Sequence, residues 1–249
     1  MKKASILLVL LTVISVGIWL GRNGLPMDSE SLTGDDSATI TDSAVQNPVP
    51  EEVLTDKDPA EEAEALQLVS RPLPAGASEL AIQKINESID SIKSNYNYIN
   101  PWLDLAAYRK ISGDNQGAIA AWNFVIKIRP TDSVAYHNLG DMHAFTLKDY
   151  SKGEEYFLSS IARNPQNVDA YIQVASIYEY HLKFKLAQTE PLLLNGINAN
   201  PDDINLKIAL ANYYRNVGNI GLARVYLEKA LELSPGNTKI KEELDSLGN

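Results

Sequence analysis

Residues 204–237 read INLKIALANYYRNVGNIGLARVYLEKALELSPGN: two apolar helical segments separated by Gly218-Asn219 and ended by Pro235. Proline has no backbone N–H to donate to the preceding turn, so each such proline marks the end of a helix. Three more helical segments upstream end in the same way: FVIKIRP (124–130), SSIARNP (159–165) and NGINANP (195–201). The four prolines are spaced by 35, 36 and 34 residues, and a period near 34 predicts stacked pairs of helices.

Residues at fixed places in each period resemble the tetratricopeptide repeat family, whose 34-residue unit is a pair of antiparallel helices with a W-x2-L-G-x2-Y pattern on the first helix. We assign four units, at 99–132, 133–167, 168–203 and 204–237. The pattern is carried by Trp102, Leu105 and Ala106 in the first unit, Tyr136, Leu139 and Gly140 in the second, Tyr171, Val174, Ala175 and Tyr178 in the third, and Leu210, Ala211 and Tyr214 in the fourth. The resemblance implies an all-α, right-handed superhelical solenoid of about four hairpins.

The same positions have a direct physical reading. Small residues allow two helices to approach closely, and large ones are expected to fill the space between consecutive pairs: Ala106, Gly140, Ala175 and Ala211 against Trp102, Trp122, Tyr136, Phe157 and Tyr171. Arg109 and His143 stand where the family has tyrosine, and Lys207 takes an aromatic place. The turns of the second and third units are longer than the family's by one and two residues.

Two flanking segments are expected to close the stack. Residues 78–98 include Leu80, Ile82, Ile85, Ile89 and Ile92 near helical spacing, which predicts a helix that packs on the first unit. Residues 238–249 are polar on one side and begin with a capping-box pattern at Thr238, which predicts a C-terminal capping helix.

The amino terminus is expected to cross a membrane. Lys2 and Lys3 precede eighteen uncharged residues, 4–21, and Arg22 ends the run. That length is at the lower limit for a span, and no A-x-A-like cleavage site follows it, so residues 1–22 are predicted to be an uncleaved signal anchor. The positive-inside rule predicts a single pass through the inner (cytoplasmic) membrane, with the C-terminal domain in the periplasm. Secretion after cleavage of the segment is the alternative.

Residues 23–77 are interpreted as an acidic, Pro-rich and mainly disordered linker. This segment has six prolines and no aromatic residue, and residues 28–70 carry twelve acids against Lys57 alone. Such a composition lacks the apolar side chains that would offset the entropy of ordering. Within it, residues 58–69 favour a short helix with Asp58 as N-cap and Pro59 at its first position. A solvated spacer and a tail that binds a basic partner are both open interpretations.

Composition excludes several functions. The chain has no cysteine, which removes disulfides and thiolate chemistry, and its net charge of −10 argues against nucleic-acid binding. No known catalytic or cofactor-binding motif is present, so we expect no enzymatic activity, no cofactor and no metal. His137 and Asp141 have a spacing that suits a metal pair, but a solvated polar pair is preferred because no further ligand is evident. His143 is expected to be partly buried, His181 exposed, and Glu154-Glu155 a pair of surface acids.

In the family, the first helix of each unit lines a concave groove that binds a protein or peptide. By that resemblance, the candidate contact residues are Leu103, Ala107, Lys110, His137, Asn138, Asp141, Ile172, Gln173, Ser176, Glu179, Ile208, Asn212 and Arg215. The leading hypothesis is a membrane-anchored, exported scaffold with a protein or peptide partner. The alternatives are an accessory subunit of an inner-membrane secretion, cytochrome-maturation or envelope-assembly complex and, more remotely, an enzyme with an unrecognised site. The partner and the oligomeric state are not encoded in any motif.

Overall fold

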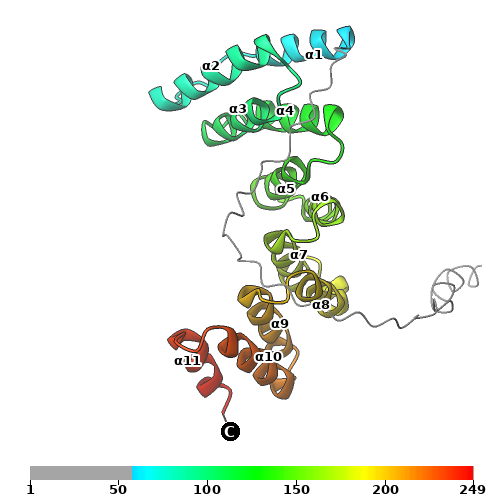
Figure 1. Ribbon diagram of the computed structural model, residues 1–249, viewed down its shortest axis with the longest axis vertical. Helices are drawn as coiled ribbons and strands as arrows, with labels where there is room; N and C mark the ends of the chain where they lie inside the picture. Colours follow the sequence, from blue (N-terminus) through cyan, green and yellow to red (C-terminus); the bar gives the residue numbers. More distant parts are fainter. Residues whose placement is uncertain (1–57, 249) are drawn as a thin grey trace, which may run out of the picture. The chain divides into compact units, whose positions relative to one another are not determined.

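The computed structural model describes residues 58–248, which contain eleven α-helices and no strand (Figure 1). The predicted membrane segment and the linker as far as residue 57 lie outside the described residues. Within the described part, none of the helices combines the length and apolar character needed to cross a bilayer.

Four helical hairpins form the body of the described chain. They are α3 (Ile99–Ile111) with α4 (Asn115–Ile128), α5 (Ser133–Asp141) with α6 (Tyr150–Arg163), α7 (Val168–Tyr180) with α8 (Thr189–Ala199), and α9 (Ile204–Asn216) with α10 (Ile220–Leu233). Consecutive hairpins follow one another along the stack (Figure 1). The all-helical solenoid expected from the 34-residue period is therefore the observed fold.

The loops between hairpins share one capping device. The second residue after each of the four prolines is the N-cap of the next helix: Asp132, Asn167, Asp203 and Asn237. Each side chain accepts a hydrogen bond from a backbone N–H of the first turn, which satisfies an otherwise unpaired donor. This corrects the prediction for the last helix, α11 (Thr238–Ser246), whose cap is Asn237 and not Thr238.

The turns within hairpins differ from one unit to the next. Gly113 and Gly218 adopt left-handed backbone angles, with φ of 83° and 82°, and Lys148 takes this conformation in the second unit with φ of 60°. The second unit absorbs its extra residue as a π-helix, Met142–Thr146, and the third absorbs two as a 3-10 helix, Lys183–Gln188. The helices that follow these insertions keep their places in the stack.

The core confirms the small and large pattern. Trp102, Trp122 and Phe157 are at most 2% exposed. A Cβ atom built on Gly140 would lie 2.8 Å from the ring of Phe157, so only glycine allows this close approach. Tyr136 is the exception, because it is half-buried and lies under the guanidinium of Arg163, 3.6 Å from the ring centroid.

Both flanking segments are helical and packed. Helix α2 (Glu79–Ser94) places Ile85, Ile89 and Ile92 in the first core, whereas Leu80 is 60% exposed, because it lies in the first turn outside that face. At the other end, Ile240 of α11 is buried against α9 and α10.

Residues 58–77 differ from the expected linker. Helix α1 (Pro59–Val69) forms with Asp58 as its N-cap, as the sequence favoured, and its Ala65 and Val69 lie in the same core as Trp102. The Tyr96 hydroxyl donates to the Asp58 carbonyl at 3.1 Å, which fixes the start of the helix. The folded chain therefore begins by residue 58, and not near residue 78.

Arg109 explains why the first unit departs from the family pattern. Its side chain is 1% exposed and donates to the backbone carbonyls of Arg71 and Pro72 and to Asp114. A tyrosine at this place could not satisfy three acceptors. Lys207 is likewise buried, and its ammonium donates to the carbonyls of Pro201 and Asp203. His143 is buried and stacks on Tyr156.

Candidate partner-binding face

The thirteen predicted contact residues all lie on the first helices of the hairpins. We call them the first-helix face: Leu103, Ala107 and Lys110 on α3, His137, Asn138 and Asp141 on α5, Ile172, Gln173, Ser176 and Glu179 on α7, and Ile208, Asn212 and Arg215 on α9. Twelve are half-buried and Arg215 is exposed. A stripe of half-buried side chains on successive helices offers polar and apolar atoms together.

Polar side chains of the face connect neighbouring hairpins. Lys110 of α3 forms an ion pair with Asp141 of α5. Further along, the Glu179 carboxylate of α7 accepts a hydrogen bond from the Asn216 amide of α9 at 2.9 Å. Each link joins two hairpins across the face, so the relative positions of the helices fix the positions of these charges.

His137 and Asp141 share a helix face but have separate partners. The Nδ2 atom of Asn167 lies 3.2 Å from Nδ1 of His137, whose ring meets Phe157 edge-on at 5.2 Å. Asp141 is held by Lys110. Among the described residues, no group of three or more His, Cys, Asp or Glu side chains is placed to hold a metal ion. His137 and Asp141 thus each contact a side chain of another element, and no printed contact joins the two.

Burial changes the charge preferences of two members. Burial lowers the pKa of His137, against the opposing effect of Asp169 and Asp141, so the neutral imidazole is favoured. Burial raises the pKa of Glu179, although the hydrogen bond from Asn216 opposes the shift. Both groups are therefore easier to hold neutral than the same groups in water.

The apolar residues of the face are each partly packed and partly exposed. Leu103, Ile172 and Ile208 each pack against a buried core cluster while keeping part of their surface accessible. The accessible part of each side chain offers apolar contact area to a partner, while polar residues of the face lie beside it.

Two residues beside the face, Asn167 and Asn216, were not predicted from the sequence. Asn167 contacts both His137 and the buried hydroxyl of Ser160, and Asn216 holds Glu179. The recurring Pro-x-Asp/Asn pattern was the available signal for Asn167, since it marks the cap of each following helix. No sequence signal identified Asn216.

Glu154 was predicted to be a surface acid, and this is wrong. It is 5% exposed, its carboxylate binds Lys185 at 2.5 Å, and the Tyr178 hydroxyl donates to it at 2.6 Å. Burial, and then the hydrogen bond to Glu154, raise the pKa of Tyr178. Both partners come from the next hairpin, so the 3-10 helix that contains Lys185 also supplies the counter-charge for a buried acid.

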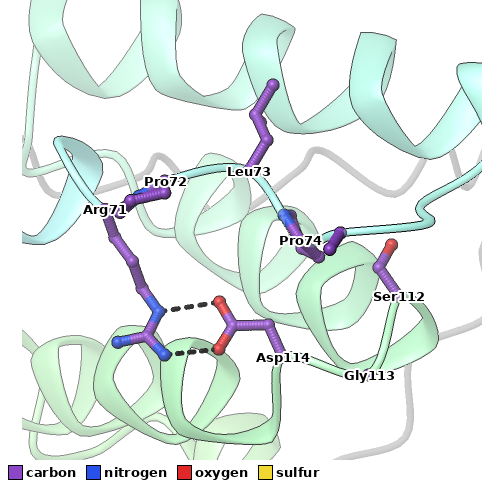
Figure 2. Close-up of a pocket in the computed structure, with 8 residues that line it drawn as sticks. Arg71, Pro72, Leu73, Pro74, Ser112, Gly113 and Asp114 are labelled. Carbon is purple, nitrogen blue, oxygen red and sulfur yellow. Dashed lines mark hydrogen bonds and ion pairs between the residues drawn. The ribbon is translucent and has the colours of Figure 1, made fainter.

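An open hollow of about 450 Å³ lies beside the turn of the first hairpin. Its lining residues include Arg71, Pro72, Leu73, Ser112 and Asp114, and Figure 2 shows the Arg71 guanidinium pointing at the Asp114 carboxylate. The two side chains form a bidentate pair at 2.7 and 2.8 Å. These groups hold the α1–α2 loop on the first hairpin.

Two segments, residues 133–167 and 204–237, match the sequence model of the tetratricopeptide repeat. By sequence, this repeat is therefore shown for two of the four hairpins. The matched segments coincide with the hairpins α5–α6 and α9–α10. None of the curated proteins compared with the chain matches it.

Solved structures with a similar fold include repeat proteins of low sequence identity. YrrB, described as a tetratricopeptide repeat protein with an unusual peptide-binding site, is 14% identical, with a TM-score of 0.51 over 66% of this chain and 82% of YrrB. A MamA structure is 19% identical, with a TM-score of 0.52 over 72% of this chain and 94% of MamA. MamA from Desulfovibrio magneticus RS-1 is 17% identical, with a TM-score of 0.51 over 71% and 97%. At these identities the likeness establishes the fold.

Proposed function

We propose that this chain is a membrane-anchored scaffold that binds a segment of a protein partner on its first-helix face. Support comes from the fold, which belongs to protein-interaction scaffolds, and from the half-buried, mixed character of the thirteen residues. A solenoid leaves one face of its first helices without a neighbouring layer, and such extended surfaces serve binding in repeat proteins. We assign the chain no catalytic step.

The chemistry of the face favours a partner segment with both apolar and polar side chains. Ile172 and Ile208 offer apolar surface, while Asn138, Gln173 and Asn212 offer amides that can pair with a peptide backbone. Lys110 and Asp141 neutralise one another, so this part of the face has no strong charge preference. An extended segment that alternates apolar and polar residues fits these groups better than a highly charged one.

Anchoring and location belong to the same proposal. The apolar run 4–21 would hold the chain in the inner membrane, and the excess of positive charge before it would place the repeats in the periplasm. Residues 23–57 would then act as a spacer between the bilayer and α1. In this arrangement the partner is a periplasmic or membrane protein.

The test is site-specific photocrosslinking of the full chain in native membranes. A photoreactive residue at position 138 or 212 should give adducts with one partner, and the same residue at Asn123 on α4 should not, because that exposed position lies on a second helix. With the photoreactive residue at one of these two positions, alanine at Asp141 and at the other asparagine should abolish the adducts and leave the helix content unchanged.

A matched variant controls for loss of surface polarity. Asn123, Glu155 and Asn195 are exposed residues on second helices, and their combined replacement with alanine should leave crosslinking at position 138 intact. Equal crosslinking at positions 138 and 123 would show that the first-helix face has no special role and would refute the proposal.

A further inference from the structure

The turns within the second, third and fourth hairpins form one continuous edge. The ring of Tyr150, at the start of α6, stacks on His181 with 3.6 Å between ring centroids. Glu179 at the end of α7 accepts the hydrogen bond from Asn216 at the end of α9. We call the residues of these three turns, 147–149, 181–188 and 215–219, with the adjoining Tyr180 and Ile220, the turn edge.

Large apolar side chains are unusually exposed along the turn edge. Phe184 is 80% exposed, Tyr180 63% and Val217 46%, and Leu147 and Ile220 are each more than 40% exposed. All three turns contribute to this set. Because contacts link the three turns, these exposed groups lie along one edge of the hairpins, and apolar groups gathered in this way favour a binding surface.

Cations without counter-ions lie among these apolar groups. Lys148, Lys183 and Arg215 are exposed, and none of them forms an ion pair within residues 58–248. Lys185 is already committed to Glu154. The turn edge therefore combines apolar tips with free positive charge.

The acids near the turn edge are largely occupied. Glu179 is half-buried and holds Asn216, Glu190 accepts the Tyr214 hydroxyl at 2.8 Å, and Asp149 caps α6. By contrast, two of the loops at the opposite ends of these helices, 164–169 and 200–203, carry Asp169, Asp202 and Asp203 and no base. The turn edge is thus more positive and more apolar than these two loops.

We propose that the turn edge docks on the headgroup layer of an anionic membrane. Aromatic and aliphatic tips enter the interface between headgroups and acyl chains, and the neighbouring bases meet lipid phosphates. The inference rests on the proposed anchor, which would keep the repeats near a bilayer. The 36 residues from 22 to 57 can span at most about 120 Å, so the turn edge can reach the membrane that holds residues 4–21.

Because the chain has no cysteine, a single introduced one reports on a single place. The full chain is reconstituted into vesicles of phosphatidylcholine with phosphatidylglycerol, carrying Val217→Cys or Val134→Cys labelled with a polarity-sensitive fluorophore. Val217 lies on the turn edge, and Val134 lies at the opposite end of the hairpins with nearly the same exposure, 46% against 47%. Only the label at position 217 should shift to shorter wavelength and be quenched by brominated lipid.

Charge variants test the electrostatic part. Replacing Lys148 or Lys183 with alanine should lower the ratio of docked to undocked chain about fivefold for each base removed, and high salt should lower the same ratio. Lys239→Ala, at an exposed base at the start of α11, should leave it unchanged. Pure phosphatidylcholine vesicles should retain the anchored chain without the shift at position 217.

The outcomes separate this inference from the proposed function. A label at position 217 that stays as water-exposed as the one at position 134 overturns lipid docking, while crosslinking on the first-helix face still supports the scaffold. Protection of position 217 in native membranes but not on anionic vesicles would assign the turn edge to a protein and also overturn it. A chain that floats with neither vesicle would refute the anchor and the docking together.

Discussion

Asp114 should be the most costly single carboxylate to remove from the described chain. It forms ion pairs with Arg109 and Arg71 and caps α4 by accepting from the Gly117 N–H at 2.9 Å. In Asp114→Ala the Arg109 charge, 1% exposed, would stay buried with only neutral carbonyls as partners. Loss of one partner from a buried pair costs about 3–5 kcal/mol. The lost N-cap adds about 1 kcal/mol.

The same contacts should make the stability of the folded chain depend on pH. Burial opposes ionisation of Asp114, but hydrogen bonds from Arg71, Gly117 and Arg109 outweigh it and lower its pKa from 3.8 to about 2. A lowered pKa stabilises the folded state above pH 4, and this contribution disappears as the pH falls towards 2. The difference corresponds to about 2 kcal/mol, so Asp114→Asn should lack that part of the acid unfolding slope.

The assay is denaturant unfolding of residues 51–249, followed by circular dichroism. Asp132→Ala is the matched control, because Asp132 caps α5 through the Ala135 N–H at 2.7 Å and forms no ion pair in the described residues. It should cost about 1 kcal/mol. If Asp114→Ala costs no more than this control, the buried Arg109 does not depend on its counter-ion and the reasoning fails.

Three further predictions concern packing, backbone strain and charge. Gly140→Leu should destabilise the chain by about 1–3 kcal/mol or more, because its Cβ would meet Phe157; unchanged melting would contradict the observed contact. Lys148→Gly should stabilise by about 1 kcal/mol by relieving a left-handed backbone, whereas the same change at Lys152, inside α6, should destabilise. Glu179→Gln should raise the melting temperature at pH 7, because the raised pKa of Glu179 means that its ionised carboxylate destabilises the folded state. The difference from the unmodified chain should vanish as the pH falls below 4.5. A difference that does not change with pH would show that it has another cause.

The fold could be predicted because its signal is local and repeated. Prolines at a period near 34 and small residues at one place per unit specify the hairpins without any long-range information. Gly140 illustrates this, since both its place in the unit and its close contact with Phe157 follow from the helical pattern.

The contacts between the first hairpin and the segment before it could not be predicted from the repeat pattern. The Arg109 guanidinium donates to backbone carbonyls 37 and 38 residues earlier in the chain. Because every residue has a backbone carbonyl, no residue type in the sequence identifies these acceptors. The segment that supplies them is acidic and rich in proline, so its composition indicated disorder although α1 buries Ala65 and Val69.

The sequence predicted which helices carry the candidate face, but not the contacts among its side chains. The spacing placed the thirteen residues on first helices, yet it could not pair Lys110 with Asp141 or Glu179 with Asn216. Those pairs depend on the angle between consecutive hairpins, which is set by packing across many residues.

The Pro-x-Asp/Asn loops allow units of different length to stack in the same way. Every connection between hairpins has the same spacing from proline to cap, whereas the extra residues of the second and third units fall inside their hairpins. An added residue turns everything after it by about 100° around a helix axis unless it is absorbed locally. Insertions in the turns within hairpins therefore leave the stacking of the hairpins unchanged. This chain could gain residues in those turns while the spacing of its first helices stays constant.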